Sequence, residues 1–273
     1  MSKTPIKYYG GKQNMLPHIL PLIPEHKIYI EPFCGGAAVF WEKPPCKCEI
    51  LNDTNGNLMN FYRTAQRVET REALINEVQA SLHSEALWRE SKEIYLNPDK
   101  HTDVMRAWAL WYCLCFSFGG AISPGNFGFA GFSGKYGGVN GITDRKKQFK
   151  SDIKRLEKVT LLETDALWIL NSDAFNKPEV FAYIDPPYYN SDCGHYKGYT
   201  EADYIKLLTF LGTEFKGRFL LSSYQSEPLN QAIALYGWET KHITQNLSVN
   251  GKSGRTKTEV LTWNYQLNQK TLF

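Results

Sequence analysis

The sequence predicts an α/β fold in which a mostly parallel sheet is covered by helices on both faces. Short apolar strand candidates alternate with helical stretches, and they are KIYIEP, CEILND, VTLLETD, VFAYIDP, RFLLSSY and TEVLTWNY. The 273 residues, 42% of them hydrophobic, are enough to bury a sizeable core. The alternation breaks between about residues 70 and 150, where helical spacing continues without strand partners. We therefore expect an α/β core, residues 1–68 and 159–273, interrupted by a helical and loop insertion, residues 69–158.

The composition excludes several classes of protein. No apolar run approaches the roughly 20 residues that span a bilayer, and the start MSKTPIKYYGGK lacks the apolar stretch of a signal peptide. The six cysteines are too sparse for a disulfide scaffold, and the pairs Cys46/Cys48 and Cys113/Cys115 are spaced more closely than zinc ligands are. We therefore expect a soluble, cytoplasmic protein with buried thiols and no metal. The net charge of +3 is too small to identify a partner.

A glycine-containing turn joins the first strand candidate to a helix in YIEPFCGGAAVFWE. Glycine lets a ligand approach the backbone closely, and the helix N-terminus offers unpaired N–H groups. Asp53 ends the next strand, roughly 20 residues beyond the turn, where Rossmann-like sheets bind ribose hydroxyls. An alternative role of Asp53 is to cap the following helix, TNGNLMNFYRTAQ, and the two roles can coexist. The turn is not GxGxxG, and Pro32 and Phe33 fill the place of a pyrophosphate. A nucleoside without phosphates fits better, with Phe33 beside its adenine or a thioether-like tail.

The string DPPY, Asp185 to Tyr188, follows the apolar strand candidate VFAYI. Pro187 disfavours the α region for Pro186, so the loop leaves the strand stiff and extended. Because two consecutive residues lack N–H groups, the Asp185 carboxylate and the Pro186 carbonyl form a rigid cluster of acceptors beside the Tyr188 ring. Such a cluster suits an amino group on a flat ring, since the acceptors hold its hydrogens against conjugation while the tyrosine stacks on the ring. The alternative is a proline-stiffened strand exit with an aspartate cap.

Five short elements follow one another along the chain: KYYGGK (7–12), EPFCGGAAVF (31–40), LNDTNGNL (51–58), DPPYYN (185–190) and LSVNGKSGRTKTEVLTWNY (247–265). In kind and order they resemble the DNA adenine methylase (Dam) family, whose elements are K-W-A-G-G-K, E-P-F-x-G, D-x-N, the catalytic DPPY and S-x-N-G…E-x-L…N-Y. The resemblance covers nearly the whole chain. It implies a Rossmann-like, S-adenosylmethionine-dependent methyltransferase core with an inserted helical and loop domain that recognises DNA.

The resemblance further implies a site-specific DNA adenine N6-methyltransferase that uses S-adenosylmethionine as its cofactor. The implied catalytic residues are Asp185, Pro186, Pro187 and Tyr188. The implied cofactor-binding residues are Tyr8, Lys12, Phe33, Gly35, Asp53, Asp165 and Asp185. Asp165, after VTLLET, is a candidate for the adenine end of the cofactor. Lys12 has the alternative of an ordinary solvated lysine.

An adenine inside a duplex must be flipped out before its amino group reaches such a site. The resemblance assigns backbone grip and base reading to the insertion, whose residues 117–150 combine glycines with aromatic and basic side chains. The candidate DNA contacts are Asn126, Lys135, Tyr136, Arg145, Lys146 and Lys147, with Lys252 and Arg255 as a second basic patch. The alternatives are a surface loop packed on its own aromatic residues and solvated basic faces. The segment has no counterpart of the N-V-P-F-G hairpin of enzymes that read GATC, so the target sequence stays open.

Two other functions compete with DNA methylation. Methyl transfer to RNA or to a protein amide is one, because related P-P-Y motifs serve there, and a non-enzymatic DNA-binding module is the other. The aspartate before the prolines and the size of the insertion favour duplex DNA as the partner. A cognate restriction endonuclease is a candidate second partner, no membrane partner is expected, and the chain is expected to be a monomer or a weak dimer. The expected location is the cytoplasm of a bacterial cell or of a phage-infected host.

Overall fold

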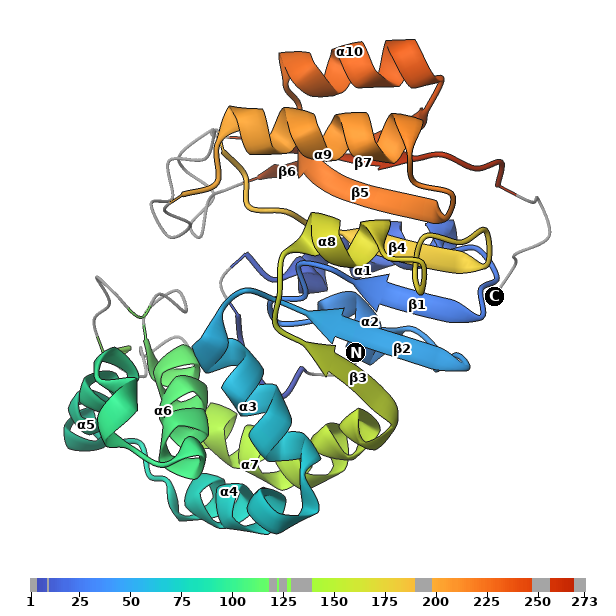
Figure 1. Ribbon diagram of the computed structural model, residues 1–273. Helices are drawn as coiled ribbons and strands as arrows, with labels where there is room; N and C mark the ends of the chain where they lie inside the picture. The colour runs from blue at the N-terminus through green and yellow to red at the C-terminus, as the bar shows by residue number, and fades with distance from the viewer. Residues whose placement is uncertain are drawn as a thin grey trace. The chain divides into compact units, whose positions relative to one another are not determined.

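The computed structural model describes residues 4–8, 10–117, 122, 127–128, 139–189, 198–246 and 256–267 (Figure 1). The chain divides into two compact units. The first contains Met1–Leu16, Gly35–Pro44 and Asp53–Glu163, and the second contains Pro17–Cys34, Pro45–Asn52 and Thr164–Phe273. These boundaries do not coincide with those expected at residues 69 and 158, and the assignment of 69–158 to target recognition stays a prediction.

The second unit is built on a mixed sheet. Its strands are β1 (Ile28–Glu31), β2 (Cys48–Asn52), β4 (Val180–Ile184), β5 (Arg218–Tyr224), β6 (Glu239–Asn246) and β7 (Thr256–Trp263). Their order is β2-β1-β4-β5-β7-β6. The first four run parallel, whereas β7 is antiparallel to both β5 and β6. Every residue of β4 is buried, as expected for a central strand of a parallel sheet. The predicted α/β fold, with a Rossmann-like core, is confirmed.

Helices complete the second unit. They are α1 (Leu16–Ile19), which begins at the last residue of the first unit, η2 (Leu20–Leu22), α8 (Ala166–Asn171), α9 (Glu201–Thr213) and α10 (Glu227–Tyr236). Figure 1 shows α9 and α10 side by side next to β5. Thr200 and Asp203 form a capping box that fixes the start of α9. The helix therefore starts where the chain returns from the segment that follows β4.

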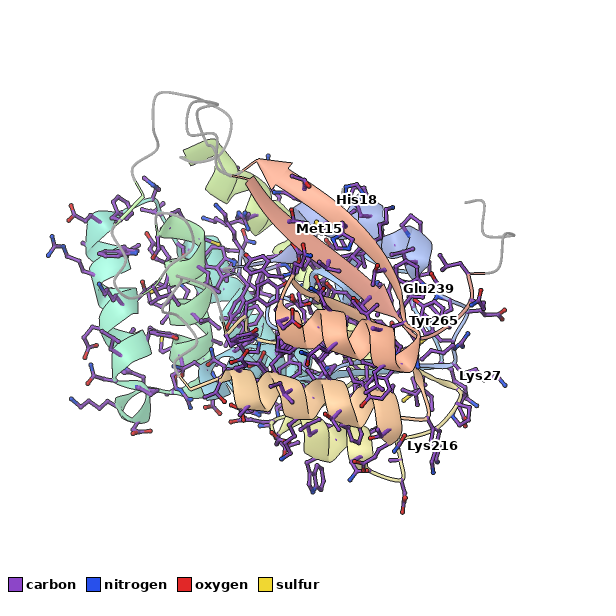
Figure 2. The ribbon with its side chains drawn as sticks, turned by 90° about the horizontal axis from the view of Figure 1, so that it is seen from above. Met15, His18, Lys27, Lys216, Glu239 and Tyr265 are labelled. Carbon is purple, nitrogen blue, oxygen red and sulfur yellow. The ribbon has the colours of Figure 1, made fainter. Side chains whose placement is uncertain are left out.

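Strand β6 is the one strand of this sheet that the sequence does not predict. Apart from the buried Ile243, its described side chains are exposed or half-buried, so it lacks the apolar run of an inner strand. Figure 2 shows it beside β7, with Tyr265 beyond the end of β7. The Tyr265 hydroxyl donates to the Leu22 carbonyl at 2.6 Å, which anchors the chain after β7 to the segment before β1.

The first unit is mainly helical. Its elements are η1 (Lys12–Met15), α2 (Ala38–Glu42), α3 (Gly56–Gln66), α4 (Val68–Ala80), α5 (Glu85–Leu96), η3 (Pro98–Lys100), α6 (Asp103–Phe116), α7 (Val139–Ile153), η5 (Lys154–Lys158) and the strand β3 (Val159–Leu162). Figure 1 shows α3 to α7 gathered into one group. The ring centroid of Trp111 on α6 lies 6.0 Å from that of Phe149 on α7, and Phe149 lies 6.3 Å from Phe61 on α3. These buried aromatic contacts give the unit a core of its own.

Candidate functional site

The glycine turn after β1 is shaped around Tyr8. Gly35 has a φ of +47°, in the left-handed region that glycine tolerates. A Cβ atom on Gly35 would lie 3.2 Å from Cδ1 of the Tyr8 ring, and one on Gly36 would lie 2.7 Å from Cβ of Tyr8. The turn therefore requires glycine at both positions, because the tyrosine packs directly on its backbone.

Asp53 holds the same turn from the end of β2. One carboxylate oxygen accepts a hydrogen bond from the Gly35 N–H at 2.9 Å, and the other accepts from the Asn55 N–H at 2.9 Å. Burial raises the pKa of Asp53, and the N–H groups of Asn55, Gly35 and Thr54 lower it in part. The N-cap of α3 is Asn55, whose side chain accepts from the N–H groups of Asn57 and Leu58. The alternative interpretation of Asp53 as the helix cap is therefore wrong.

Three of the predicted cofactor-binding residues meet in the first unit. Tyr8, Gly35 and Asp53 come from three separate sequence elements, and Asn55 adds a hydrogen bond from its side-chain amide to the Tyr8 hydroxyl at 3.2 Å. The Tyr62 hydroxyl donates to the Gly35 carbonyl at 2.8 Å, so the turn is held from a further side. The structure thus brings an aromatic ring, a glycine turn and a carboxylate together, and a carboxylate at the end of this strand is the group that accepts hydrogen bonds from ribose hydroxyls in Rossmann-like sheets.

Lys12 belongs to the same unit and is not an ordinary solvated lysine. It lies in η1 with 8% of its surface exposed, and its ammonium group donates to the Gly10 carbonyl at 3.3 Å. Its contact with a cofactor stays a prediction.

In the second unit, the predicted catalytic string begins where the buried strand β4 ends. The Tyr188 hydroxyl lies 3.1 Å from a carboxylate oxygen of Asp185 and 2.8 Å from a carboxylate oxygen of Glu259. Burial, and then the negative charges of these two carboxylates, raise the pKa of Tyr188 well above its ordinary value. The phenol is therefore a hydrogen-bond donor at any physiological pH. Its ring packs edge-on against Tyr224, with centroids 4.3 Å apart.

Two further candidates for the cofactor lie in the second unit. The Phe33 ring makes an edge-to-face contact with Tyr199 at a centroid distance of 6.2 Å. Asp165 is exposed and serves as the N-cap of α8, where its carboxylate accepts from the Trp168 N–H at 3.0 Å. Asp165 therefore has a structural role in the fold, and its contact with the cofactor stays a prediction.

The predicted DNA contacts are only partly within the described residues. Arg145, Lys146 and Lys147 lie on α7, in a stretch that the sequence suggests only as a basic run. Lys147 is exposed, whereas the Lys146 ammonium donates to the Ser81 carbonyl at 2.7 Å. Arg145 is half-buried near Cys115, whose pKa is raised by burial and lowered in part by the arginine. The remaining candidates lie outside the described residues: Asn126, Lys135, Tyr136, Lys252 and Arg255.

Sequence reasoning missed four residues that hold these groups in place. Asn55 and Tyr62 fix the turn, and Ser222 and Glu259 fix Tyr188. Glu259 stands in the E-x-L element of the C-terminal resemblance, which is the one sequence signal that pointed to it. Ser222 belongs to the polar pair Ser222 and Ser223 near the end of β5, and the sequence contains no other indication of its role.

Two general properties follow from the described part of the chain. Within it, no three His, Cys, Asp or Glu side chains gather in a way that would hold a metal ion. None of the helices described there has the length and apolar character to cross a bilayer.

Comparison with known proteins identifies the family. The model of the D12 class N6 adenine-specific DNA methyltransferases matches residues 8–245. The chain is 32% identical to the type II methyltransferase M1.LlaDCHI of Lactococcus lactis subsp. cremoris over 285 residues, 95% of this chain and 94% of that protein. It is 25% identical to a DNA adenine methylase of Vibrio cholerae serotype O1 over 192 residues, 67% of this chain and 64% of that protein. Over 61 residues it is 48% identical to the DNA N-6-adenine-methyltransferase of Escherichia phage P1, 22% of this chain and 8% of that protein. The predicted resemblance is confirmed, and the chain belongs to the family of D12 class N6 adenine-specific DNA methyltransferases.

Proposed function

We propose that the protein methylates the N6 amino group of an adenine at a specific sequence in double-stranded DNA, with S-adenosylmethionine as the methyl donor. The observation that carries the proposal is the end of β4. Asp185 is the first residue after the fully buried strand β4, and two prolines follow it. The Tyr188 hydroxyl is hydrogen-bonded to the carboxylates of Asp185 and Glu259. This arrangement offers acceptors in fixed positions to an amino group on a flat ring.

When bound, S-adenosylmethionine supplies an electrophilic methyl group on its sulfonium sulfur. The Asp185 carboxylate and the Pro186 carbonyl accept hydrogen bonds from the two N–H groups of the adenine amine. These hydrogen bonds oppose the conjugation of the nitrogen lone pair with the ring. The same carboxylate takes the proton that the amine loses when its nitrogen accepts the methyl group and the bond between that carbon and the sulfonium sulfur breaks. The prolines contribute by removing two N–H groups that would otherwise compete for these acceptors.

In the first unit, Asp53 accepts hydrogen bonds from the ribose hydroxyls of the cofactor, as a carboxylate does at this position of Rossmann-like sheets. The glycines of the turn let Tyr8 pack against the backbone, and the Tyr8 ring gives the cofactor an apolar wall. Lys12, Phe33 and Asp165 are the remaining proposed contacts.

The DNA is bound by basic side chains that grip phosphates, and the adenine is flipped out of the duplex. On α7 the exposed Lys147 is the best-supported of these contacts, because Lys146 already donates to a backbone carbonyl. The proposal includes a partner restriction endonuclease with the same target sequence. The chain is a monomer or a weak dimer, and it is located in the cytoplasm.

The function is tested by incubating the purified chain with labelled S-adenosylmethionine and, in parallel, unmethylated duplex DNA, structured RNA and a protein extract. We expect label in the duplex DNA, recovered as N6-methyladenine after digestion. Sequencing the DNA of cells that express the chain should then place the modified adenines in one short sequence. Label in RNA or protein with none in DNA would refute the proposal.

Replacing Gly36 by alanine is expected to weaken S-adenosylmethionine binding by roughly 10-fold, because a clash of 2.7 Å must push Tyr8 off the turn. Isothermal titration calorimetry measures this effect. Gly10→Ala is the matched control. Its new methyl group meets no atom within 4 Å, although its φ of +71° strains the segment that carries Tyr8. Equal losses in both variants would show that segment strain, and not Tyr8, sets the affinity.

A further inference from the structure

Four polar side chains of the second unit form what we call the tyrosine–carboxylate network: Asp185, Tyr188, Ser222 and Glu259. The β5–β7 pairing explains how it assembles. Tyr224 on β5 faces Glu259 on β7, and Ser222 stands two residues before Tyr224, hence on the same face of the sheet. The Glu259 carboxylate is therefore held on the face where Ser222 and Tyr188 can reach it. It is 8% exposed, and Ser222 is fully buried.

Glu259 is the better acceptor for the Tyr188 hydroxyl. A phenol has one proton to donate, and the network offers it two carboxylates. The distance to Oε1 of Glu259 is 2.8 Å, against 3.1 Å to Oδ1 of Asp185. Oε1 of Glu259 also accepts from the Ser222 hydroxyl at 2.6 Å, which fixes the carboxylate in place. The position of the Tyr188 hydroxyl is thus set mainly from β7.

This contact has a consequence for Asp185. The residues from Asp185 to Tyr188 form a short, stiff segment whose two inner residues are prolines. One end is fixed by strand β4, and the other is fixed by the hydrogen bond from Tyr188 to Glu259. A stiff segment held at both ends keeps the carboxylate and the carbonyl between them at constant positions.

We propose that Glu259 is a positioning residue for methyl transfer, which holds Tyr188 and through it fixes the acceptors of the Asp185–Tyr188 segment. The inference rests on the proposed role of Asp185 as the acceptor of the adenine amine. A displacement of about 1 Å in such a site can cost a rate factor of roughly 100. The position of the Glu259 oxygen, and not its charge, is therefore the property that matters.

Two variants separate position from charge. Glu259→Gln keeps an acceptor oxygen at the same place without the charge, whereas Glu259→Asp keeps the charge but withdraws the oxygen by about 1.5 Å, one C–C bond. We expect kcat of the glutamine variant within roughly threefold of the unchanged protein, and kcat of the aspartate variant lower by roughly 10- to 100-fold. The KM values for DNA and S-adenosylmethionine should change little in both. The reverse order of the two variants would overturn the proposal.

A double-mutant cycle adds a second readout. Glu259→Ala and Tyr188→Phe both remove the same hydrogen bond, so the double variant should be no slower than the slower single variant. Additive losses would contradict the proposal. Thr262→Val is the control on the same strand, because its buried hydroxyl has no hydrogen-bond partner among the described residues and valine keeps its shape. It should retain the full kcat.

The role of Asp185 as an acceptor and the positioning role of Glu259 are refuted by different results. If Asp185→Asn keeps full activity, the proposed role of Asp185 is wrong. If Asp185→Asn is inactive while Glu259→Asp has an unchanged kcat, only the positioning role is wrong. Thermal unfolding of each variant, followed by circular dichroism, shows that the compared chains are folded. Should Glu259→Ala not fold, the comparison of glutamine with aspartate decides the matter alone.

Discussion

Replacing Asp185 by alanine is expected to lower kcat for adenine methylation by roughly 10³-fold, the scale of removing one preorganised electrostatic contact from an active site. The amine loses its charged acceptor and the acceptor of its departing proton. Asp185→Asn should be nearly as slow, because its amide can place an N–H donor where the amine also needs an acceptor. Single-turnover transfer of labelled methyl groups at saturating DNA and cofactor measures this rate.

The loss should not come from unfolding. Asp185 shares the Tyr188 hydroxyl with Glu259, so its removal also relieves the repulsion between two neighbouring carboxylates. The melting temperature of the alanine variant should therefore stay close to that of the unchanged protein. Asp173→Ala, an exposed carboxylate of the same unit, is the control and should keep full activity. A kcat for Asp185→Ala above about a tenth of the original would show that the carboxylate is not the acceptor.

The sequence predicts the inner strands well because their signal is local. Strands β1, β2, β4, β5 and β7 all coincide with short apolar candidates. Strand β6 is missed because a mostly exposed strand at the end of the sheet needs few apolar residues. Helix α7 is missed because most of its residues are polar or basic, whereas α6 is apolar along most of its length, and the Phe149 ring of α7 packs against Trp111.

The residues of the candidate site also divide into those that have a local sequence signal and those that depend on the fold. The glycine turn and Asp53 could be found from the sequence because a glycine turn and a strand-ending carboxylate have a recognisable spacing, whereas Tyr8 and Gly35 are named only by the resemblance to the DNA adenine methylase family. The residues that orient Tyr8 and Tyr188 could not be named from the sequence. Asn55 looks like an ordinary helix cap, and Glu259 looks like any residue of an antiparallel strand. Their roles arise only when the fold brings their side chains to Tyr8 and Tyr188. Supporting contacts of this kind depend on tertiary structure, and the short D-x-N and E-x-L elements that contain Asn55 and Glu259 do not show which side chains these residues reach.

Replacing Asp53 by alanine is expected to weaken S-adenosylmethionine binding by at least roughly 100-fold. Hydrogen bonds from the ribose hydroxyls to a charged acceptor contribute about 1.5–3 kcal/mol each, and the variant loses them. It also leaves the N–H groups of Gly35 and Asn55 without the acceptor that they share. Calorimetric titration with S-adenosylmethionine and with its demethylated product measures the loss, and Asp173→Ala should bind both normally.

The pH dependence gives this prediction its sharpest form. Burial raises the pKa of Asp53 above its ordinary value, so the carboxylate becomes protonated at a higher pH than an exposed aspartate does. Affinity for the cofactor should be constant above that pKa and fall as the pH drops through it, because only the ionised form accepts from both ribose hydroxyls. The stability of the unliganded fold should move in the opposite direction. A raised pKa means that the folded chain binds the proton more tightly, so this stabilising contribution is complete below the unfolded pKa and is lost as the pH rises through the folded pKa. Asp53→Asn should therefore bind weakly at every pH without the acidic limb of the binding profile. An acidic limb that persists in the asparagine variant would assign the titration to another group.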